Sequence, residues 1–279
     1  MTIRRGILLA LAFSVTQPGV THAQQRPLVT EDPETVGVHR VLVEGGVEVD
    51  KDQLYTAYGV KGDVVHGPTF GVSVGISPSA EIQVDGGLFQ RLTVTGRRPA
   101  PLTHVLTFTG DHASTLEDFT VATKIRIAPE SERHPALGVR FGTKLPTAKR
   151  EYAMGLGTTD FFASVLVAKT VQSVRTVGNV SFLVMGNPQG AQESVHGLGF
   201  GVSVARALTN ALEVVGEVNG RTRPWGDAVP AGLDGRGTLR LAGRFTHALL
   251  RLDFGVLVGI TARDPAFGIT AGATYVITK

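Results

Sequence analysis

Hydrophobic and polar residues alternate along most of this chain, and one short stretch shows the pattern clearly. In residues 138–150, GVRFGTKLPTAKR, Phe141 and Leu145 fall on one side of an extended backbone with Val139, and Arg140 and Lys144 fall on the other. Such a strand fits two architectures. In a soluble sandwich the apolar face points into the core, whereas in a membrane barrel it faces lipid and the charges line the lumen.

Amphipathic segments of about ten residues recur to the end of the chain. They cover residues 38–50, 67–77, 81–92, 118–128, 135–146, 159–170, 175–186, 195–206, 211–222, 237–247, 249–261 and 267–278. No apolar stripe with a period of 3.6 residues runs for a dozen residues, so the pattern predicts an all-β protein.

The lengths of the segments and connectors separate the two architectures. Strands of roughly 9–11 residues cross a bilayer at a tilt, while soluble strands average nearer five or six. Short connectors such as PSA, VQSV and ALTN alternate with longer ones at 51–66, 93–117, 147–158, 187–194 and 223–236. Tight turns at one rim and long loops at the other are typical of a membrane barrel. We therefore predict an antiparallel transmembrane β-barrel of about 12 strands over residues 37–279.

The N-terminus has a separate character. Arg4 and Arg5 precede a short apolar run, GILLALAFSV, and VTHA ends at Ala23. This order is typical of a secretory signal peptide, predicted here as residues 1–23 and cleaved after Ala23. Residues 24–36, with two prolines and alternating charge, are predicted to be a periplasmic lead-in without regular structure. An exported chain without an apolar run of 18 residues is periplasmic, secreted or an outer-membrane barrel, and the strand pattern favours the bacterial outer membrane.

Composition excludes several classes of partner. Removing the two signal-peptide arginines takes the formal charge from +3 to +1, so we expect no nucleic-acid partner. The chain has no cysteine, and its eight histidines lack metal-ligand spacing, which predicts no metal site and no cofactor. The cluster Asp111, His112 and Ser114 is read as an ordinary polar loop, and the glycines of HGLGFG (196–201) as a strand wall, so no enzyme is expected.

The charged faces of the strands supply the candidate site. If the apolar faces meet lipid, these residues line the lumen: Arg40, Glu44, Glu48, Glu81, Asp85, Lys124, Arg126, Arg140, Lys144, Glu213, Glu217, Arg240, Arg244, Arg251 and Asp253. They would either line a narrow pore and set its selectivity or pair across the lumen and fill it. Twelve strands lie between barrels filled by side chains and barrels with open channels, so both alternatives stay open.

The middle of the chain resembles a known family. Residues 119–170 contain LPT at a strand end, GLGTTD before the next strand and AKT at its end, while 207–218 and 267–277 add further likeness. These pieces resemble the outer-membrane barrels named "MetA-pathway of phenol degradation", whose members are described as transporters. The resemblance implies passage of small hydrophobic or aromatic compounds and supplies no catalytic residue.

Two functions follow as hypotheses. The first is a monomeric, passive channel for a small molecule of unidentified structure, in contact with outer-membrane lipid and inserted by the barrel-assembly machinery. The alternative is a closed barrel with a charge-filled lumen and a structural or adhesive role.

Overall fold

A computed structural model describes residues 26–190, 193–226 and 229–278 of the chain. The predicted signal peptide lies outside these residues. The strands are β1 (Arg40–Tyr55), β2 (Val60–Ser77), β3 (Ala80–Gly87), β4 (Gln90–Arg97), β5 (His112–Thr115), β6 (Phe119–Ala128), β7 (Ala136–Leu145), β8 (Asp160–Val171), β9 (Val174–Met185), β10 (Val195–Ala207), β11 (Leu212–Arg221), β12 (Arg236–His247), β13 (Leu250–Gly259) and β14 (Phe267–Thr278). Two short 3₁₀ turns, η1 (Thr103–Val105) and η2 (Arg150–Tyr152), accompany them. No helix in this part of the chain is long and apolar enough to span a membrane.

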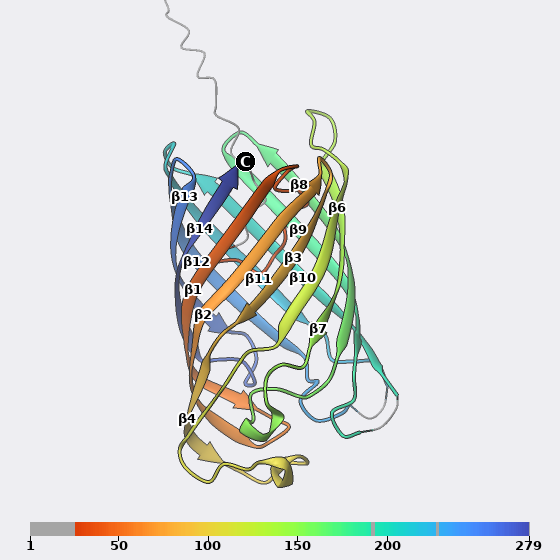
Figure 1. The fold of residues 1–279 in the computed structure, drawn as a ribbon, viewed down its shortest axis with the longest axis vertical. Coiled ribbons are helices and arrows are strands. Elements are labelled where there is room, and N and C mark those ends of the chain that lie inside the picture. The colour runs from red at the N-terminus through yellow and green to blue at the C-terminus, as the bar shows by residue number, and fades with distance from the viewer. Residues whose placement is uncertain (1–25, 191–192, 227–228, 279) are drawn as a thin grey trace, which may run out of the picture.

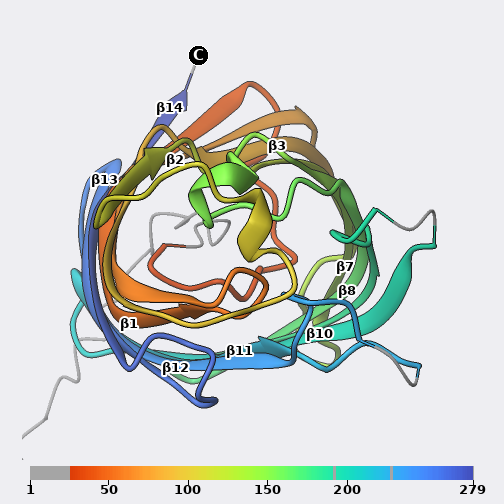
Figure 2. The same ribbon diagram turned by 90° about the horizontal axis from the view of Figure 1, so that it is seen from below.

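The sheet closes on itself. Each strand from β6 to β14 pairs antiparallel with the next, and β1 pairs with both β14 and β2. The register runs from Arg40 opposite Thr278 to Lys51 opposite Phe267, so first and last strands meet along their length. β4 and β5 lie outside this ring, which leaves a closed barrel of 12 strands (Figures 1 and 2). The predicted fold class is confirmed.

Two predicted connectors are wrong. Residues 51–66 are mostly strand, because β1 continues to Tyr55 and β2 begins at Val60. Residues 93–117 contain the end of β4, all of β5 and η1. The predicted segment 81–92 is also interrupted after Gly87, since β2 pairs with β3 through residues 69–77 and with β4 through residues 60–66. Pairing across distant residues decides these bounds, and local alternation does not contain that information.

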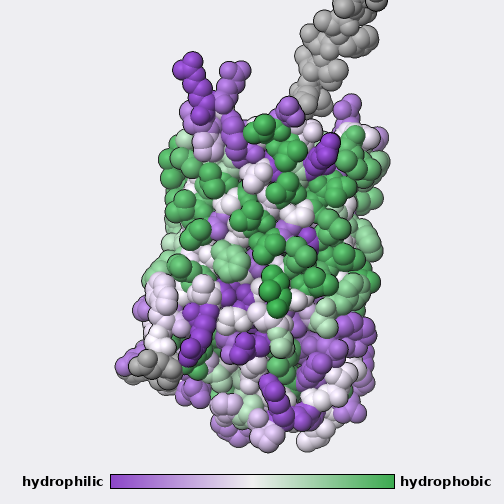
Figure 3. Space-filling model, turned by 180° about the vertical axis from the view of Figure 1, so that it is seen from behind, coloured by the Kyte–Doolittle hydropathy of each residue, from purple (hydrophilic) through white to green (hydrophobic). Residues whose placement is uncertain are grey.

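The barrel wall is apolar outside. Phe141 and Leu145 are exposed on the outer face of β7, at 47% and 37%, while Arg140 and Lys144 point inward and form ion pairs there. Exposed apolar side chains on other strands include Phe161, Val165, Val180, Leu241 and Phe254. On the face drawn in Figure 3, apolar residues cover the middle of the barrel and polar residues gather toward both ends. A contiguous apolar band of this size is what a lipid-embedded barrel presents.

The two ends of the barrel differ. At one end, turns such as 172–173 and 248–249 are short, and β1 begins and β14 ends there. We call this the short-turn end. The other, long-loop end carries the extended β1–β2 hairpin, η1, η2 and the loop before β12 (Figures 1 and 2).

Candidate functional site

The lumen contains the chain's own N-terminal segment. Residues 26–36, predicted to be a periplasmic lead-in, run inside the barrel from Val36 near the short-turn end to Arg26 beside the paired strands β1 and β14. We call residues 26–36 the plug segment. The prediction that it lacks regular structure agrees with the structure, but its predicted place outside the barrel was wrong. The polar lumen supplies hydrogen-bond and ion-pair partners for the charged residues of this segment. The composition of the segment alone does not show that such partners exist inside the barrel.

Lumen carboxylates satisfy the backbone of the plug segment. Glu217 accepts hydrogen bonds from the amides of Val29 and Thr30 and from the Thr30 hydroxyl. Glu81 accepts from the amide of Val36 at 2.6 Å. Backbone N–H groups buried away from water need hydrogen-bond acceptors. The carboxylates of Glu217 and Glu81 accept the hydrogen bonds that a neighbouring strand would accept in a sheet.

The same segment is held by charge. Lys124 donates to Glu31 at 2.7 Å and lies 3.0 Å from Glu81, and its ammonium is fully buried. Arg175 binds Asp32 through two nitrogens, at 2.6 and 2.8 Å. Buried charges persist only when paired and hydrogen-bonded, so these contacts fix the position of the plug segment.

Glycines on the wall make room for the plug segment. A Cβ at Gly201 would lie 2.6 Å from the hydroxyl oxygen of Thr30, and one at Gly272 would lie 2.3 Å from Nε of Arg26. Gly201 belongs to the stretch HGLGFG, whose glycines are predicted to form part of a strand wall. The neighbour that packs against Gly201 is the plug segment.

The long-loop end is closed by a small hydrophobic cluster. Ala57 and Tyr58, in the β1–β2 turn, pack with Leu102 beside η1 and Ala153 beside η2. The Tyr58 hydroxyl donates to the carbonyl oxygen of Gly155 at 2.5 Å, and burial raises the pKa of Tyr58 to about 12. We call this assembly, residues 55–60, 98–106 and 150–157, the lid. Figure 2 shows its segments crossing the mouth of the barrel.

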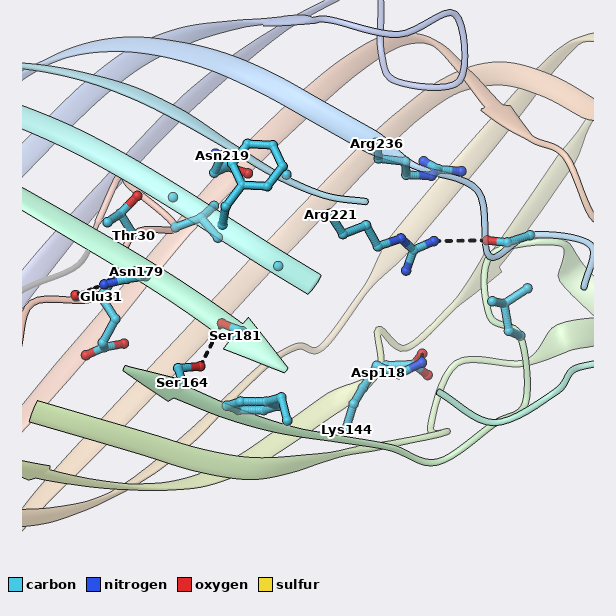
Figure 4. Close-up of a pocket in the computed structure, with 18 of the residues that line it drawn as sticks. Thr30, Glu31, Asp118, Lys144, Ser164, Asn179, Ser181, Asn219, Arg221 and Arg236 are labelled. Carbon is cyan, nitrogen blue, oxygen red and sulfur yellow. Dashed lines mark hydrogen bonds and ion pairs between the residues drawn. The ribbon is translucent and has the colours of Figure 1, made fainter. Parts of the chain in front are cut away.

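A cavity of about 550 Å³ lies between the plug segment and the lid. Val29, Thr30 and Glu31 form part of its lining on the plug side, and Tyr55–Tyr58 with Met154–Leu156 line it on the lid side. Its wall combines apolar side chains with polar ones that point into the space, among them Ser164, Asn179, Arg221 and Arg236 (Figure 4). Its volume falls in the range of roughly 300–1,000 Å³ that small-molecule sites occupy.

The predicted lumen residues divide into three groups by their contacts. Those that touch the plug segment are Glu44, Glu81, Lys124, Arg126, Arg140, Glu217, Arg244 and Asp253. Those that pair with other residues of the wall are Glu48 with Arg240, Glu213 with Arg244, Asp85 with Arg140, Lys144 with Asp118 and Asp160, and Arg251 with the hydroxyl of Thr246. Arg40 stands apart, because it is exposed at the short-turn end.

Sequence reasoning missed several residues of the site. The acidic residues of the plug segment were placed outside the barrel, and their partner Arg175 was not selected. His66, between Glu117 at 2.8 Å and Asp50 at 3.6 Å, lay in what was read as a loop. Arg221 lies within the predicted segment 211–222 but is absent from the candidate residues, and Arg236 lies one residue before the predicted segment 237–247. Both arginines follow the period-two alternation of the candidate residues, Arg221 after Glu213 and Glu217, and Arg236 before Arg240 and Arg244, so this period could have found them.

The residues considered for chemistry have other roles. A ring nitrogen of His112 contacts the hydroxyl of Thr93 at 3.2 Å, and the two residues pair across β4 and β5. Among the described residues, no group of three or more histidines, aspartates or glutamates is arranged to hold a metal ion. The polar groups of the lumen hold the plug segment and line the cavity.

Comparison with known proteins places the fold. No family model matches the chain, and no curated protein matches it. Among solved structures, the "COG4313 outer membrane channel" of Pseudomonas putida F1 is similar with a TM-score of 0.62 and 12% identity, over 86% of this chain and 96% of that one. The translocator domain of the autotransporter NalP from Neisseria meningitidis (TM-score 0.47, 10% identity, 85% and 87% covered) and LpxR from Salmonella typhimurium (0.43, 10%, 84% and 99%) are more distant. At these identities the likeness concerns the fold alone.

Proposed function

We propose that this protein is an outer-membrane channel through which a small apolar or aromatic molecule diffuses without energy input. The observation that carries the proposal is the cavity of about 550 Å³ inside a lipid-facing barrel, bounded by the plug segment on one side and the lid on the other. In this proposal the short-turn end faces the periplasm and the long-loop end faces the exterior.

The character of the cavity supports a small amphipathic solute. Phe162, Leu166, Met154 and Leu156 provide apolar surface, and the few polar side chains between them could orient a solute. The resemblance to barrels of phenol degradation points to the same class. The structurally similar channel from Pseudomonas putida F1 supplies a precedent for the fold and not for the solute.

Passage requires the plug segment to move. Most of its contacts with the wall are hydrogen bonds and ion pairs, which water and ions can replace. Its apolar contacts are those of Leu28 with Ala205, Val215 and Ala242, and of Val36 with Leu42 and Val276. The plug segment is continuous with β1 at the short-turn end, so it can leave the lumen without unfolding the barrel.

A closed barrel with a structural role is the second candidate. The observation that favours it is the extensive pairing of lumen charges, because ion pairs such as Arg240 with Glu48 at 2.7 Å occupy part of the lumen. This candidate predicts a barrel without measurable conductance, whether or not the plug segment is linked to the wall.

A reversible tether distinguishes the two. A Cβ built on Gly201 lies 3.4 Å from Cβ of Thr30, close to the roughly 3.5–4.5 Å that a disulfide spans. The double variant Thr30→Cys with Gly201→Cys therefore links the plug segment to the wall in a chain with no other cysteine. Planar-bilayer conductance, and uptake of phenol by Gram-negative cells that lack their general porins, are measured with the link oxidised and reduced.

The channel proposal expects low conductance and uptake when the link is oxidised and recovery of both on reduction. The wild type, treated with the same reductant, is the control and should not respond. If oxidised, reduced and wild-type barrels are all folded, all electrically silent and all without effect on uptake, the channel proposal fails and the structural role remains.

A further inference from the structure

Two arginines face each other at the outer end of the cavity. Arg221, the last residue of β11, and Arg236, the first residue of β12, are direct partners in the register of the two strands. Both line the cavity between plug segment and lid, and Figure 4 shows their guanidinium groups in the same region.

The pair breaks the charge pattern of its own strands. Farther along the same two strands, Glu213 is opposite Arg244, with a contact of 3.1 Å, and Glu217 is opposite Arg240. Like charges directly opposite each other destabilise a strand pair. In the register of β11 and β12, Arg221 and Arg236 are thus the one opposed pair in which both residues are cationic.

Neither guanidinium has a carboxylate partner within the described part of the chain. Arg221 donates from Nε to the carbonyl oxygen of Asp234 and from one terminal nitrogen to that of Gly232, at 3.1 and 3.0 Å. Arg236 donates to the carbonyl oxygen of Leu54 at 3.1 Å. A guanidinium has five N–H donors, so donors remain on both side chains.

The carboxylates that act electrostatically on Arg221 are engaged with other partners. Asp160, Asp234 and Asp264 attract Arg221 electrostatically without forming an ion pair with it. Asp160 pairs with Lys144 at 2.9 Å, and Asp234 pairs with Arg263 at 3.2 Å. Asp264 accepts hydrogen bonds from the amides of Gly237 and Thr261.

We propose that Arg221 and Arg236 together bind the carboxylate of a small organic acid whose apolar body occupies the cavity. The inference rests on the proposed function and names the class of solute: a monocarboxylate with an aromatic or short aliphatic body. Two planar guanidinium forks match the geometry of a carboxylate, and an anion between them offsets their mutual repulsion. The apolar body lies against Phe162, Leu166 and Leu156, which line the same cavity.

The arginine pair lies where a solute entering from the long-loop end would first contact the cavity. The two arginines bind the carbonyls of Gly232, in the loop before β12, and of Leu54, the penultimate residue of β1, and both lie at the long-loop end. An acid arriving from outside meets the two cations directly beneath the lid. The plug segment, with Glu31 and the carboxylates that hold it, lies deeper, so release inward follows its displacement.

The test is binding of benzoate and benzamide, a charged and a neutral compound of nearly the same shape, to the folded full-length barrel in detergent by isothermal titration calorimetry. Arg221→Gln and Arg236→Gln each remove one cation. Arg206→Gln removes the same charge from an exposed position near the short-turn end of β10 and is the matched control.

We expect the wild type to bind benzoate at least about tenfold more tightly than benzamide, and each cavity variant to lose about tenfold of the benzoate affinity. Benzamide binding and the Arg206→Gln control should not change. Equal affinity for the two compounds, binding of neither, or benzoate binding that survives both cavity substitutions would overturn the inference.

The two proposals fail separately. If benzoate binds as expected but the reduced tether variant gives neither conductance nor uptake, the arginine pair binds anions in a barrel that is not a channel. If flux recovers on reduction while benzoate and benzamide bind alike, the channel stands and the carboxylate assignment is wrong.

Discussion

Nζ of Lys124 lies 2.7 Å from Oε1 of Glu31, so a strand of the barrel wall and the N-terminal plug segment share a fully buried ion pair. Glu81, on the neighbouring strand β3, completes the arrangement at 3.0 Å from the same nitrogen. Lys124 therefore contacts two buried carboxylates, and Nε of Arg140 lies 3.5 Å from the second oxygen of Glu31.

Lys124→Met should loosen the plug segment and destabilise the protein. Removing one partner of a buried pair leaves the other charge uncompensated, which costs about 3–5 kcal/mol. Glu81 would lose the cation that lies 3.0 Å away, and Glu31 would keep only Arg140, at 3.5 Å. We expect a lower midpoint in the heat-dependent gel-mobility shift and more frequent opening in planar bilayers.

Lys51→Met is the comparison for that experiment. Lys51 contacts Asp63 at 2.5 Å, but its side chain is 56% exposed, and such surface pairs contribute only about 0–1 kcal/mol. Combining Lys124→Met with Glu81→Gln should recover part of the lost stability. If Lys124→Met has the same midpoint as the wild type, the ion pair does not contribute the stability that we assign to it.

The barrel itself follows from the period of the sequence. Side chains of a strand alternate between faces, so Phe141 and Arg140 must lie on opposite sides of the wall whatever the rest of the fold does. Segment length and connector rhythm then separate the membrane barrel from a soluble sandwich. These are local properties, and the sequence displays them directly.

The plug segment could not be predicted in the same way. Residues 26–36 have no period, and their contacts join residues far apart in the chain, as when the amide of Val29 meets Glu217. The strand charges gave an ambiguous signal, since a filled lumen and an open pore need the same residues. What resolves the ambiguity is a second chain segment in the lumen, and its own sequence resembles a solvated linker.

Gly201→Val should displace the plug segment while leaving the barrel closed. The new side chain would overlap Thr30, whose hydroxyl oxygen would lie 2.6 Å from the added Cβ. Overpacking of this kind costs about 1–3 kcal/mol, which the segment can avoid by leaving the wall. Conductance should rise, and the unheated protein should keep its folded mobility on gels.

Gly243→Val provides the matched control for Gly201→Val. It adds the same side chain to another barrel strand, at a position where a Cβ meets nothing within 4 Å. Its conductance should equal that of the wild type. Equal conductance of the two variants would mean that Thr30 does not restrict the lumen.

Tyr58→Phe should weaken the lid without affecting the wall. The substitution leaves the carbonyl oxygen of Gly155 without the donor that now lies at 2.5 Å, at an expected loss of about 1–3 kcal/mol of local stability. Faster hydrogen exchange at Leu102, whose amide donates to Ala57 in the same cluster, reports the change. Tyr275→Phe, on the outer face of β14 and 47% exposed, should leave this exchange unaltered.

Acid should release the turn between β6 and β7 before it unfolds the barrel. Glu130, in this turn, accepts hydrogen bonds from the amide and hydroxyl of Thr170 and from Arg175. Burial by itself would raise the pKa of Glu130, but these hydrogen bonds outweigh it and hold the pKa below its ordinary value of 4.5. A carboxyl whose pKa is lowered by folding stabilises the folded state above its unfolded pKa, and that contribution is lost as the pH falls through the folded value.

The pH dependence can be assigned with Glu130→Gln. We compare hydrogen-exchange protection, the observed rate relative to the intrinsic rate at the same pH. In the wild type, protection of residues 129–135 should be constant from neutral pH down to the ordinary pKa of glutamate and should fall below it. In Glu130→Gln, protection should already be lower at neutral pH, because an amide accepts the same bonds more weakly than a carboxylate, and it should fall less in acid. Arg175 also holds Asp32 of the plug segment at 2.6 Å, so loosening of the plug segment in acid should accompany the loss of this turn. Identical acid profiles for the two proteins would assign the transition to another carboxylate.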